Sequence, residues 1–489
     1  MRIPLSLLAA TAVVLAPAAA AQTAGRVLNP RDVANAQRQH AELVAEFGGA
    51  ETGARGAYVE SVGRRVTAFS GIANPAAAFR FTTLNSAVEN AFADPGGYVY
   101  ITRQLMTVMN DEAELAFVLG HEAGHIAANH GQARQSAATR NTIGGILGAI
   151  IGSVVGGGFG SAIAQFSQQA AQLYTLSFSR EQEYQADVLG IRYMTSAGYD
   201  PGGAPDMLAA LTRSTALQAR VQGRTTRQVP EWASTHPLSE NRTQQARADA
   251  QRTGRLGVGL RNRDQFLAQL NGIYVDDDPA QGVIEGRSFT HPDLMMQFVV
   301  PAGYLMQNSS RAVGIRGSAG QAQFSGGRFA GPLEQYIQQV LHQLTGGRTQ
   351  MAVQPARRTV INGMPAAFTT ARANTQSGAV DLTVVAYEWD RDTKYHFVMM
   401  TQAGAGIGPF GSMVNSLRRI SPNEAAAIRP RVIQVVTVGP NDTVQSLAGR
   451  MAYRDFQVER FTALNNIPVN ARLVPGQRVK LVVFGARRG

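Results

Sequence analysis

Apolar residues recur with a helical period in several segments of the first half of the chain. Leu115, Val118, Leu119 and Ile126 fall on one side of a helix that the spacing predicts over residues 111–128. Similar patterns predict helical structure over 30–70 and 173–197, whereas the polar stretch 215–232 predicts a loop or a frayed helix. Strands are predicted at 79–83 and 97–101, the second directly after the turn Pro95-Gly96-Gly97.

The pattern changes near Asp276-Asp277-Asp278-Pro279. Beyond it, strand-like segments at 296–300, 380–387 and 395–401 flank a predicted helix at 333–344, and a separately patterned segment follows at 434–484. The predicted fold class is therefore α+β multidomain. It has a mainly helical domain with a small sheet at 22–270, an α+β domain at 276–425 and a small, separately patterned domain at 432–486.

The first residues have the features of a secretory leader. Arg2 is followed by a mostly apolar stretch from Leu5 to Leu15 and by four alanines ending at Ala21, where cleavage is expected. The alternative, a membrane anchor, needs a longer apolar run. The chain contains no cysteine, which excludes disulfides and a lipid-modified cysteine. We expect an exported, periplasmic protein with residues 1–21 removed.

The net charge of +11 comes almost entirely from arginine, because Lys394 and Lys480 are the only lysines. A basic surface can meet anionic lipid, cell-wall polymer or nucleic acid. Since no dense run of basic residues occurs, a nucleic-acid partner is not expected.

The helix predicted at 111–128 carries the sequence His121-Glu122-Ala123-Gly124-His125. Two histidines four residues apart project from one face and can bind one Zn²⁺ through their ring nitrogens. Glu122 can then take a proton from a water molecule whose pKa the metal lowers. The alternative, a solvated helix with two histidines, disagrees with the apolar flank 115–119.

A catalytic zinc site needs a third protein ligand from elsewhere in the chain. Glu183 and Asp187 lie four residues apart in the helix predicted at 173–197 and share a face. Glu183 can bind the metal, while Asp187 can accept a hydrogen bond from the far nitrogen of a histidine ligand. An acidic helix face in solvent is the alternative for this pair.

Four sequence blocks together resemble the M48 family of gluzincin metallopeptidases. The blocks, all within residues 30–250, are Asn90-Ala91-Phe92-Ala93-Asp94-Pro95-Gly96-Gly97, His121 to His125, Ser179-Arg180 with Glu183 and Ala186-Asp187, and Ser234-Thr235-His236-Pro237 with Arg242. Asp94 departs from the family pattern, in which an apolar residue is common. The resemblance implies a zincin-type zinc peptidase domain at 22–270 with one Zn²⁺ per chain.

The resemblance also implies a role for individual residues. His121, His125 and Glu183 would be the metal ligands, with Glu122 as the general base and Asp187 supporting a ligand. His236 would lie near the metal, where it could stabilise an oxyanion or occupy the open metal position in a closed state, and Arg242 would orient nearby groups. A turn residue and a surface ion pair are the respective alternatives for His236 and Arg242. His130 matches no ligand spacing and is expected at the helix end or supporting a ligand.

Substrate binding is expected at the strand that follows the Gly96-Gly97 turn. An edge strand can pair with an extended peptide through main-chain hydrogen bonds, so unfolded polypeptides are the expected substrates. Asn90, Gly96 and Gly97 are the expected substrate-binding residues.

The segment 143–164 is apolar and rich in glycine, and no charged residue occurs between Arg140 and Arg180. A membrane span is one interpretation. Because glycine destabilises isolated helices, we expect a mobile helical hairpin near the active site that contacts a membrane surface.

The last segment resembles a LysM module, a family of βααβ domains that bind N-acetylglucosamine-containing glycans. The matching residues are Val436-Thr437-Val438, Pro440-Asn441-Asp442-Thr443-Val444, Leu447-Ala448, Leu464-Asn465 and Leu473-Val474-Pro475-Gly476-Gln477-Arg478-Val479. The resemblance implies peptidoglycan as a partner, with a purely structural module as the alternative.

The sequence therefore predicts a periplasmic zinc metalloendopeptidase that cleaves unfolded or misassembled envelope proteins. An inactive envelope scaffold, chaperone or peptidoglycan-binding protein is a second hypothesis, but such a protein would be expected to lack part of the set His121, Glu122, His125 and Glu183. A zinc peptidoglycan hydrolase is a third, which the M48-like blocks disfavour.

Overall fold

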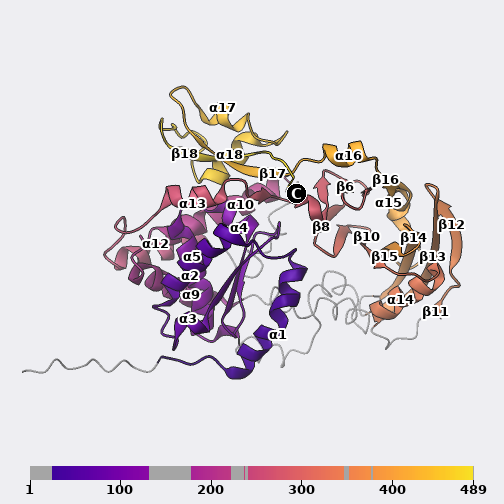
Figure 1. Ribbon diagram of the computed structural model, residues 1–489, viewed down its shortest axis with the longest axis horizontal. Coiled ribbons are helices and arrows are strands. Elements are labelled where there is room, and N and C mark those ends of the chain that lie inside the picture. The colour runs from indigo at the N-terminus through magenta and orange to yellow at the C-terminus, as the bar shows by residue number, and fades with distance from the viewer. Residues whose placement is uncertain are drawn as a thin grey trace, which may run out of the picture.

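The computed structural model describes residues 25–131, 178–221, 236, 240–345, 352–375 and 378–487. The predicted leader and the glycine-rich segment 143–164 lie outside these residues. Figure 1 shows a helical N-terminal part, a C-terminal module in yellow on top of it, and a sheet-rich middle part in orange beside them. The fold is thus α+β with several parts. Among the described residues, no helix has the length and hydropathy to cross a membrane.

Helices surround a small three-stranded sheet in the N-terminal part. The helices are α1 (Pro30–Glu46), α2 (Gly53–Thr67), α3 (Pro75–Ala78), α4 (Arg103–Val108), α5 (Glu112–Ala127), α9 (Arg180–Ser196), α10 (Gly203–Val221), α12 (Glu240–Arg252) and α13 (Arg263–Leu270). The strands are β1 (Arg80–Leu84), β2 (Ala91–Ala93) and β3 (Tyr98–Thr102), in the order β1-β3-β2. β3 runs parallel to β1 and antiparallel to β2, so it is the central strand.

The sequence patterns locate most of these elements to within a few residues. The predicted helix 30–70 is interrupted between α1 and α2, where Gly48 and Gly49 have φ of +79° and +97°. Such angles suit glycine and end a helix. The helix α10 extends to Val221, so the start of the predicted loop 215–232 is helical. The remainder of that stretch lies outside the described residues.

The sheet is buried on both faces. Phe92 and Tyr100 point to a cluster with Leu43 of α1 and Leu84 of β1. Their neighbours in the strands, among them Ala91 and Ile101, belong to the large core that also contains α5. This alternation places α1 on one face of the sheet and α5 on the other.

The middle part consists of an eight-stranded sheet and a four-stranded sheet, and all the described strand pairs in both sheets are antiparallel. The larger sheet runs β11-β13-β14-β15-β10-β9-β8, with β12 also pairing with β13, and the smaller runs β16-β7-β6-β5. The strands are β5 (Val283–Glu285), β6 (Ser288–His291), β7 (Met296–Val299), β8 (Leu305–Asn308), β9 (Ala312–Gly317), β10 (Gly320–Arg328), β11 (Ala352–Val353), β12 (Arg357–Ile361), β13 (Met364–Thr375), β14 (Gly378–Glu388), β15 (Thr393–Gln402) and β16 (Arg418–Arg419). The helices are α14 (Leu333–Thr345), α15 (Gly411–Ser416) and α16 (Pro422–Ala427), with short 3-10 turns at Pro279–Gln281 and Gly408–Phe410. Two separate hydrophobic clusters form the core of this part.

The C-terminal module has the element order β17 (Arg431–Thr437), α17 (Val444–Ala448), α18 (Gln457–Asn465) and β18 (Arg478–Phe484). This is the predicted βααβ order. β17 also pairs with β4 (Tyr274–Val275), at the end of the N-terminal part. Ile433, Leu447 and Phe461 belong to the same hydrophobic cluster as α5. The C-terminal module therefore shares a hydrophobic core with the helical N-terminal part, although the middle part lies between them in the sequence.

Lys480 of β18 lies at this junction and is fully buried. Its Nζ donates hydrogen bonds to the carbonyl oxygens of Thr107 (2.7 Å) and Met109 (2.5 Å), just before α5 begins. Because buried polar groups need hydrogen-bond partners, these two contacts tie the Lys480 side chain to the residues before α5. The C-terminal module thus contacts the residues just before α5, the helix that carries His121 and His125.

Candidate metal centre

The helix α5 holds His121, Glu122 and His125 in the interior. Asp111 is its N-cap and accepts a hydrogen bond from the backbone N–H of Glu114 at 3.0 Å. The side chains from Glu112 to Ile126 are all buried, so the apolar flank expected from the sequence packs into the core. A solvated helix with two histidines is therefore excluded.

The helix α9 brings Glu183 and Asp187 to the same place. It starts with a capping box in which Ser179 and Gln182 bond reciprocally to each other's backbone. Small residues let the two helices approach closely, since a Cβ added to Gly190 would lie 2.9 Å from the backbone nitrogen of His121. Both carboxylates are 2% exposed, which rules out the alternative of an acidic face in solvent.

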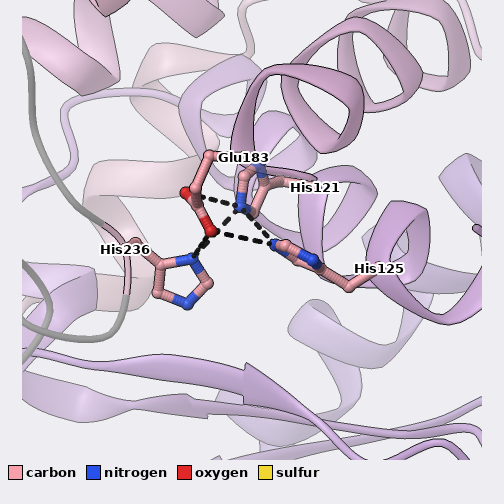
Figure 2. Close-up of side chains that lie close together, drawn as sticks. All are labelled: His121, His125, Glu183 and His236. Carbon is pink, nitrogen blue, oxygen red and sulfur yellow. Dashed lines mark hydrogen bonds and ion pairs between the residues drawn. The ribbon is translucent and has the colours of Figure 1, made fainter. Parts of the chain in front are cut away.

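Four buried side chains meet in one cluster, His121, His125, Glu183 and His236, with one ligand atom from each within 4.8 Å of the others. Figure 2 shows the three imidazole rings converging on the Glu183 carboxylate. The Nε2 atoms of His121 and His125 are 3.0 Å apart, and His125 Nε2 is 3.4 Å from Glu183 Oε1. His236 Nδ1 is 2.9 Å from the same oxygen and 3.3 Å from His121 Nε2.

These separations fit a tetrahedral metal site. Nitrogen and oxygen ligands of zinc lie at 2.0–2.2 Å, so their mutual distances in a tetrahedron are about 3.3 to 3.6 Å. The four separations given above lie between 2.9 and 3.4 Å, at or slightly below this range. Three of the four donors are imidazole nitrogens, which zinc favours. Burial lowers the pKa of His125 well below its ordinary value, so this ring is neutral, as a metal ligand must be.

Asp187 and Arg242 support the cluster. Asp187 Oδ1 accepts from His121 Nδ1 at 2.9 Å, which turns the other nitrogen of that ring toward Glu183. Arg242 donates to both oxygens of Asp187, at 2.6 and 2.8 Å, and pairs with Glu183 Oε2 at 2.7 Å. Burial alone would raise the pKa of Asp187, but the Arg242 guanidinium outweighs burial and lowers the pKa. A surface ion pair is thus excluded for Arg242, which is 4% exposed.

Glu122 lies next to His236 beside the cluster. Glu122 follows His121 on α5 and is 1% exposed, and its Oε1 lies 3.6 Å from Nε2 of His236. One ring nitrogen of His236 thus contacts Glu183 in the cluster, and the other lies near Glu122. Sequence reasoning placed His236 near the metal from the M48-like motif, and the structure brings it to the fourth corner of the cluster.

Comparisons with known proteins agree with this geometry. The model of peptidase family M48 matches residues 53–250, which contain all of these side chains. Residues 53–250 are an M48 peptidase domain. Curated relatives include the β-barrel assembly-enhancing protease of Yersinia pestis, 31% identical over 39% of this chain and 38% of that protein. The protein of the same name from Escherichia coli is 29% identical, covering 44% and 43% of the two chains. The mitochondrial metalloendopeptidase OMA1 of Arabidopsis thaliana is 30% identical, covering 33% and 29%.

The chain thus spans less than half the length of these curated relatives. The matched region corresponds to the helical N-terminal part, and M48 peptidases are metal-dependent. The middle part and the C-terminal module lie outside the family match.

The M48 domain presents β2 at the edge of its sheet. The expectation that the strand after the Gly96-Gly97 turn is an edge strand was wrong, because this strand, β3, is covered by β1 on one side and β2 on the other. Local sequence patterns predict strands but not their order, which depends on non-local pairing. Within the described residues the edge strands of this sheet are β1 and β2, and β2 is the strand before the turn.

Asn90, next to β2, is 1% exposed. Neither polar atom of its side chain has a hydrogen-bond partner within the described part of the chain. Leaving a buried polar group unsatisfied costs about 1–3 kcal/mol, so a bound peptide that pairs with this amide would recover that energy. The substrate-binding role of Asn90 stays a prediction.

Gly96 and Gly97 have structural contacts of their own. A Cβ on Gly96 would lie 2.5 Å from the carbonyl oxygen of Asp32 in α1, and Gly97 has φ of +94°. Asp94 Oδ1 accepts from the backbone N–H of Gly96 at 2.7 Å, so the residue that departs from the family pattern closes the turn. Close packing against α1 accounts for Gly96, and a positive φ together with close approach to the Ala78 carbonyl accounts for Gly97. Their substrate-binding role stays a prediction.

Two contacts near the site had no signal in the sequence patterns. Phe178, just before α9, stacks on the ring of His125 with 3.7 Å between centroids. Glu89, just before Asn90, accepts from the hydroxyl of Ser214 at 2.8 and 3.0 Å and so ties the start of β2 to α10. Burial raises the pKa of Glu89 from 4.5 to about 7. Both contacts join segments distant in sequence.

The raised pKa of Glu89 predicts a pH-dependent stability. The folded protein keeps this proton between pH 4.5 and about 7, where the unfolded chain releases it. The stabilisation is therefore complete below pH 4.5 and is lost as the pH rises to about 7, by on the order of 3 kcal/mol. In Glu89→Gln this loss should be absent, so the variant should gain stability relative to the wild type between pH 5 and pH 7.5.

Urea unfolding at the two pH values measures this difference. Glu285→Gln, at an exposed glutamate of β5, is the matched control and should follow the wild type. If the free energy of unfolding changed equally with pH in Glu89→Gln and the wild type, Glu89 would not have the raised pKa.

Proposed function

We propose that this protein is a zinc-dependent metalloendopeptidase that cleaves extended segments of unfolded or misassembled proteins in the periplasm. The single observation that carries the proposal is the buried set His121, His125, Glu183 and His236 beside the carboxylate of Glu122. A chain that had lost catalysis would be under no constraint to keep ligands, base and supporting groups together.

His121, His125 and Glu183 would hold the zinc ion, and its Lewis acidity would lower the pKa of a water molecule. Glu122 would serve as the general base for a water molecule that attacks the scissile carbonyl and would return the proton to the leaving amine. Asp187 keeps the tautomer of His121 fixed, and Arg242 keeps Asp187 and Glu183 ionised. These groups are all buried before any substrate binds, so little reorganisation is needed.

His236 would have two roles. In the structure its Nδ1 lies at the fourth corner of the cluster, where it would compete with water and substrate for the metal. Displaced toward the substrate, the imidazole could donate to the oxyanion that forms at the scissile carbonyl. We therefore propose that the arrangement seen is a closed state and that substrate binding moves His236.

An extended peptide would pair with β2, an edge strand of the described sheet. Main-chain hydrogen bonds would align it beside α5, and Asn90 would supply its unsatisfied amide. Because main-chain pairing is largely independent of side chains, we expect broad specificity for polypeptides that are already unfolded. A folded substrate would not present a free strand.

The cellular location, the physiological substrates and the partners of the enzyme are also proposals. The leader-like residues 1–21 support export, and the similarity to β-barrel assembly-enhancing proteases supports envelope proteins as substrates. The βααβ order of the C-terminal module supports a LysM-like contact with peptidoglycan, and the apolar segment 143–164 supports contact with a membrane surface. No nucleic-acid partner is proposed.

Metal analysis and a cleavage assay test the proposal together. The purified chain should contain one zinc ion, and it should degrade casein until a chelator removes the metal. Glu183→Ala should lose zinc, whereas His40→Phe, at a histidine of α1 that contacts Tyr100, should keep it. A fully zinc-loaded protein that leaves casein and unfolded envelope proteins intact would favour the scaffold hypothesis.

A further inference from the structure

His130, which the sequence placed at the helix end or in support of a ligand, lies against a proposed metal ligand. Its Nδ1 is 2.9 Å from Nδ1 of His125, and its Nε2 is 3.0 Å from Oε1 of Gln185 in α9. His130 is 4% exposed, while Gln185 is exposed. The imidazole of His130 thus occupies the side of the His125 ring that faces away from Glu183.

A turn at the end of α5 creates this contact. Residues five apart in a helix do not share a face, so His125 and His130 could not meet within a continuous helix. Asn129 has φ of +60°, in the left-handed region that asparagine tolerates, and its N–H bonds to the carbonyl of Ile126 at 3.0 Å. Gly131 then packs against Pro95, since a Cβ there would lie 2.6 Å from Pro95 Cγ. This turn folds His130 back over His125.

The hydrogen-bond chemistry of the pair is determined by the metal-facing nitrogen. For His125 Nε2 to offer its lone pair toward Glu183 and His121, the proton of the neutral ring must be on Nδ1. His130 Nδ1 must then accept this N–H, which leaves the proton of His130 on Nε2, where it can donate to Gln185. The tautomer of His125 therefore determines the tautomer of His130 through the hydrogen bond between the two rings.

The two histidines of α5 are supported by different groups. His121 donates to the Asp187 carboxylate, whereas His125 meets the imidazole of His130. Groups that bond the far nitrogen of a metal-binding histidine fix its tautomer and ring orientation. Stacking of Phe178 restrains the ring of His125 but supplies no acceptor for its N–H.

We infer that His130 is a positioning residue that holds His125 in the tautomer and orientation required to bind the metal, through an Nδ1–H···Nδ1 hydrogen bond built by the turn at Asn129. The inference rests on the proposed zinc site. It assigns a function to a histidine that matches no ligand spacing, and it predicts that metal affinity depends on a residue that does not touch the metal.

Zinc affinity, measured by competition with a chromogenic chelator, tests the inference without relying on catalysis. His130→Phe keeps a flat ring but removes the acceptor, and it should raise the zinc dissociation constant about 10- to 100-fold. His130→Asn, whose amide oxygen can stand near the position of Nδ1, should restore most of the affinity. A role in packing alone would predict the opposite order, because phenylalanine fills the space of the ring better than asparagine.

Two variants of the turn provide a second measurement with His130 unchanged. Asn129→Gly preserves access to positive φ and should bind zinc like the wild type, whereas Asn129→Val disfavours it and should weaken binding. Thermal unfolding of the zinc-free proteins shows whether each variant is folded, and His40→Phe is the control for loss of a histidine elsewhere.

The outcomes separate this inference from the proposed function. Wild-type affinity in folded His130→Phe, or equal affinities of Asn129→Gly and Asn129→Val, would overturn the role of His130 while leaving the metal site intact. A wild-type protein that binds no zinc would instead overturn the metal site itself.

Discussion

Glutamine in place of Glu122 should leave zinc bound and lower kcat for peptide hydrolysis by about 10²- to 10⁴-fold, the usual contribution of a general base. The side chain is buried beside the cluster, and its Oε1 lies 3.6 Å from Nε2 of His236. Glutamine has nearly the same shape but cannot take a proton from water. Because Glu122 is not one of the clustered ligand residues, the metal should remain.

Initial rates of cleavage of an unstructured peptide, together with the zinc content of the same sample, provide the measurement. Glu285→Gln makes the same chemical change at an exposed position and should retain the wild-type rate. If Glu122→Gln carried zinc and cleaved the peptide at the wild-type rate, Glu122 would not be the base and the proposed mechanism would fail.

Removing Arg242 should have the largest effect on stability. Its guanidinium pairs with Asp187 at 2.6 Å and with Glu183 at 2.7 Å, and all three side chains are at most 5% exposed. Arg242→Met would leave two carboxylates buried without their cation, which typically costs about 3–5 kcal/mol. A bound zinc ion supplies positive charge at the same place, so the loss should be larger in the metal-free protein than in the zinc-loaded one.

Urea unfolding with and without zinc measures both quantities. Arg358→Met is a suitable control, because Arg358 forms a two-point ion pair with Glu334 at the surface and its loss should change the free energy of unfolding little. An Arg242→Met protein as stable as the wild type without metal would show that Asp187 and Glu183 take up protons instead of remaining ionised.

The C-terminal module packs against the M48 domain. The sequence pattern separates residues 432–486 from the peptidase region by some 160 residues, which favours a tethered and independent unit. In the structure β17 pairs with β4, and Lys480 reaches the carbonyls that precede α5. The C-terminal module is therefore packed against the peptidase domain as well as linked to it through the chain.

The sequence by itself determined the local parts of the site. Helical period, the N-cap Asp111 and the capping box at Ser179 are properties of short segments, so α5 and α9 and the faces that carry His121, His125, Glu183 and Asp187 follow from spacing alone. The M48-like motifs added His236 and Arg242, whose contacts with α9 span more than 50 positions of the chain.

Only the tertiary structure decided how these segments meet. It placed β3 at the centre of the sheet and β2 at its edge, because strand order depends on pairing between distant segments. It turned His130 onto His125 through a left-handed residue that helical spacing does not anticipate, and it joined the C-terminal module to the core of the peptidase domain. Local patterns specify which side chains an element presents, whereas non-local packing specifies which side chains come together.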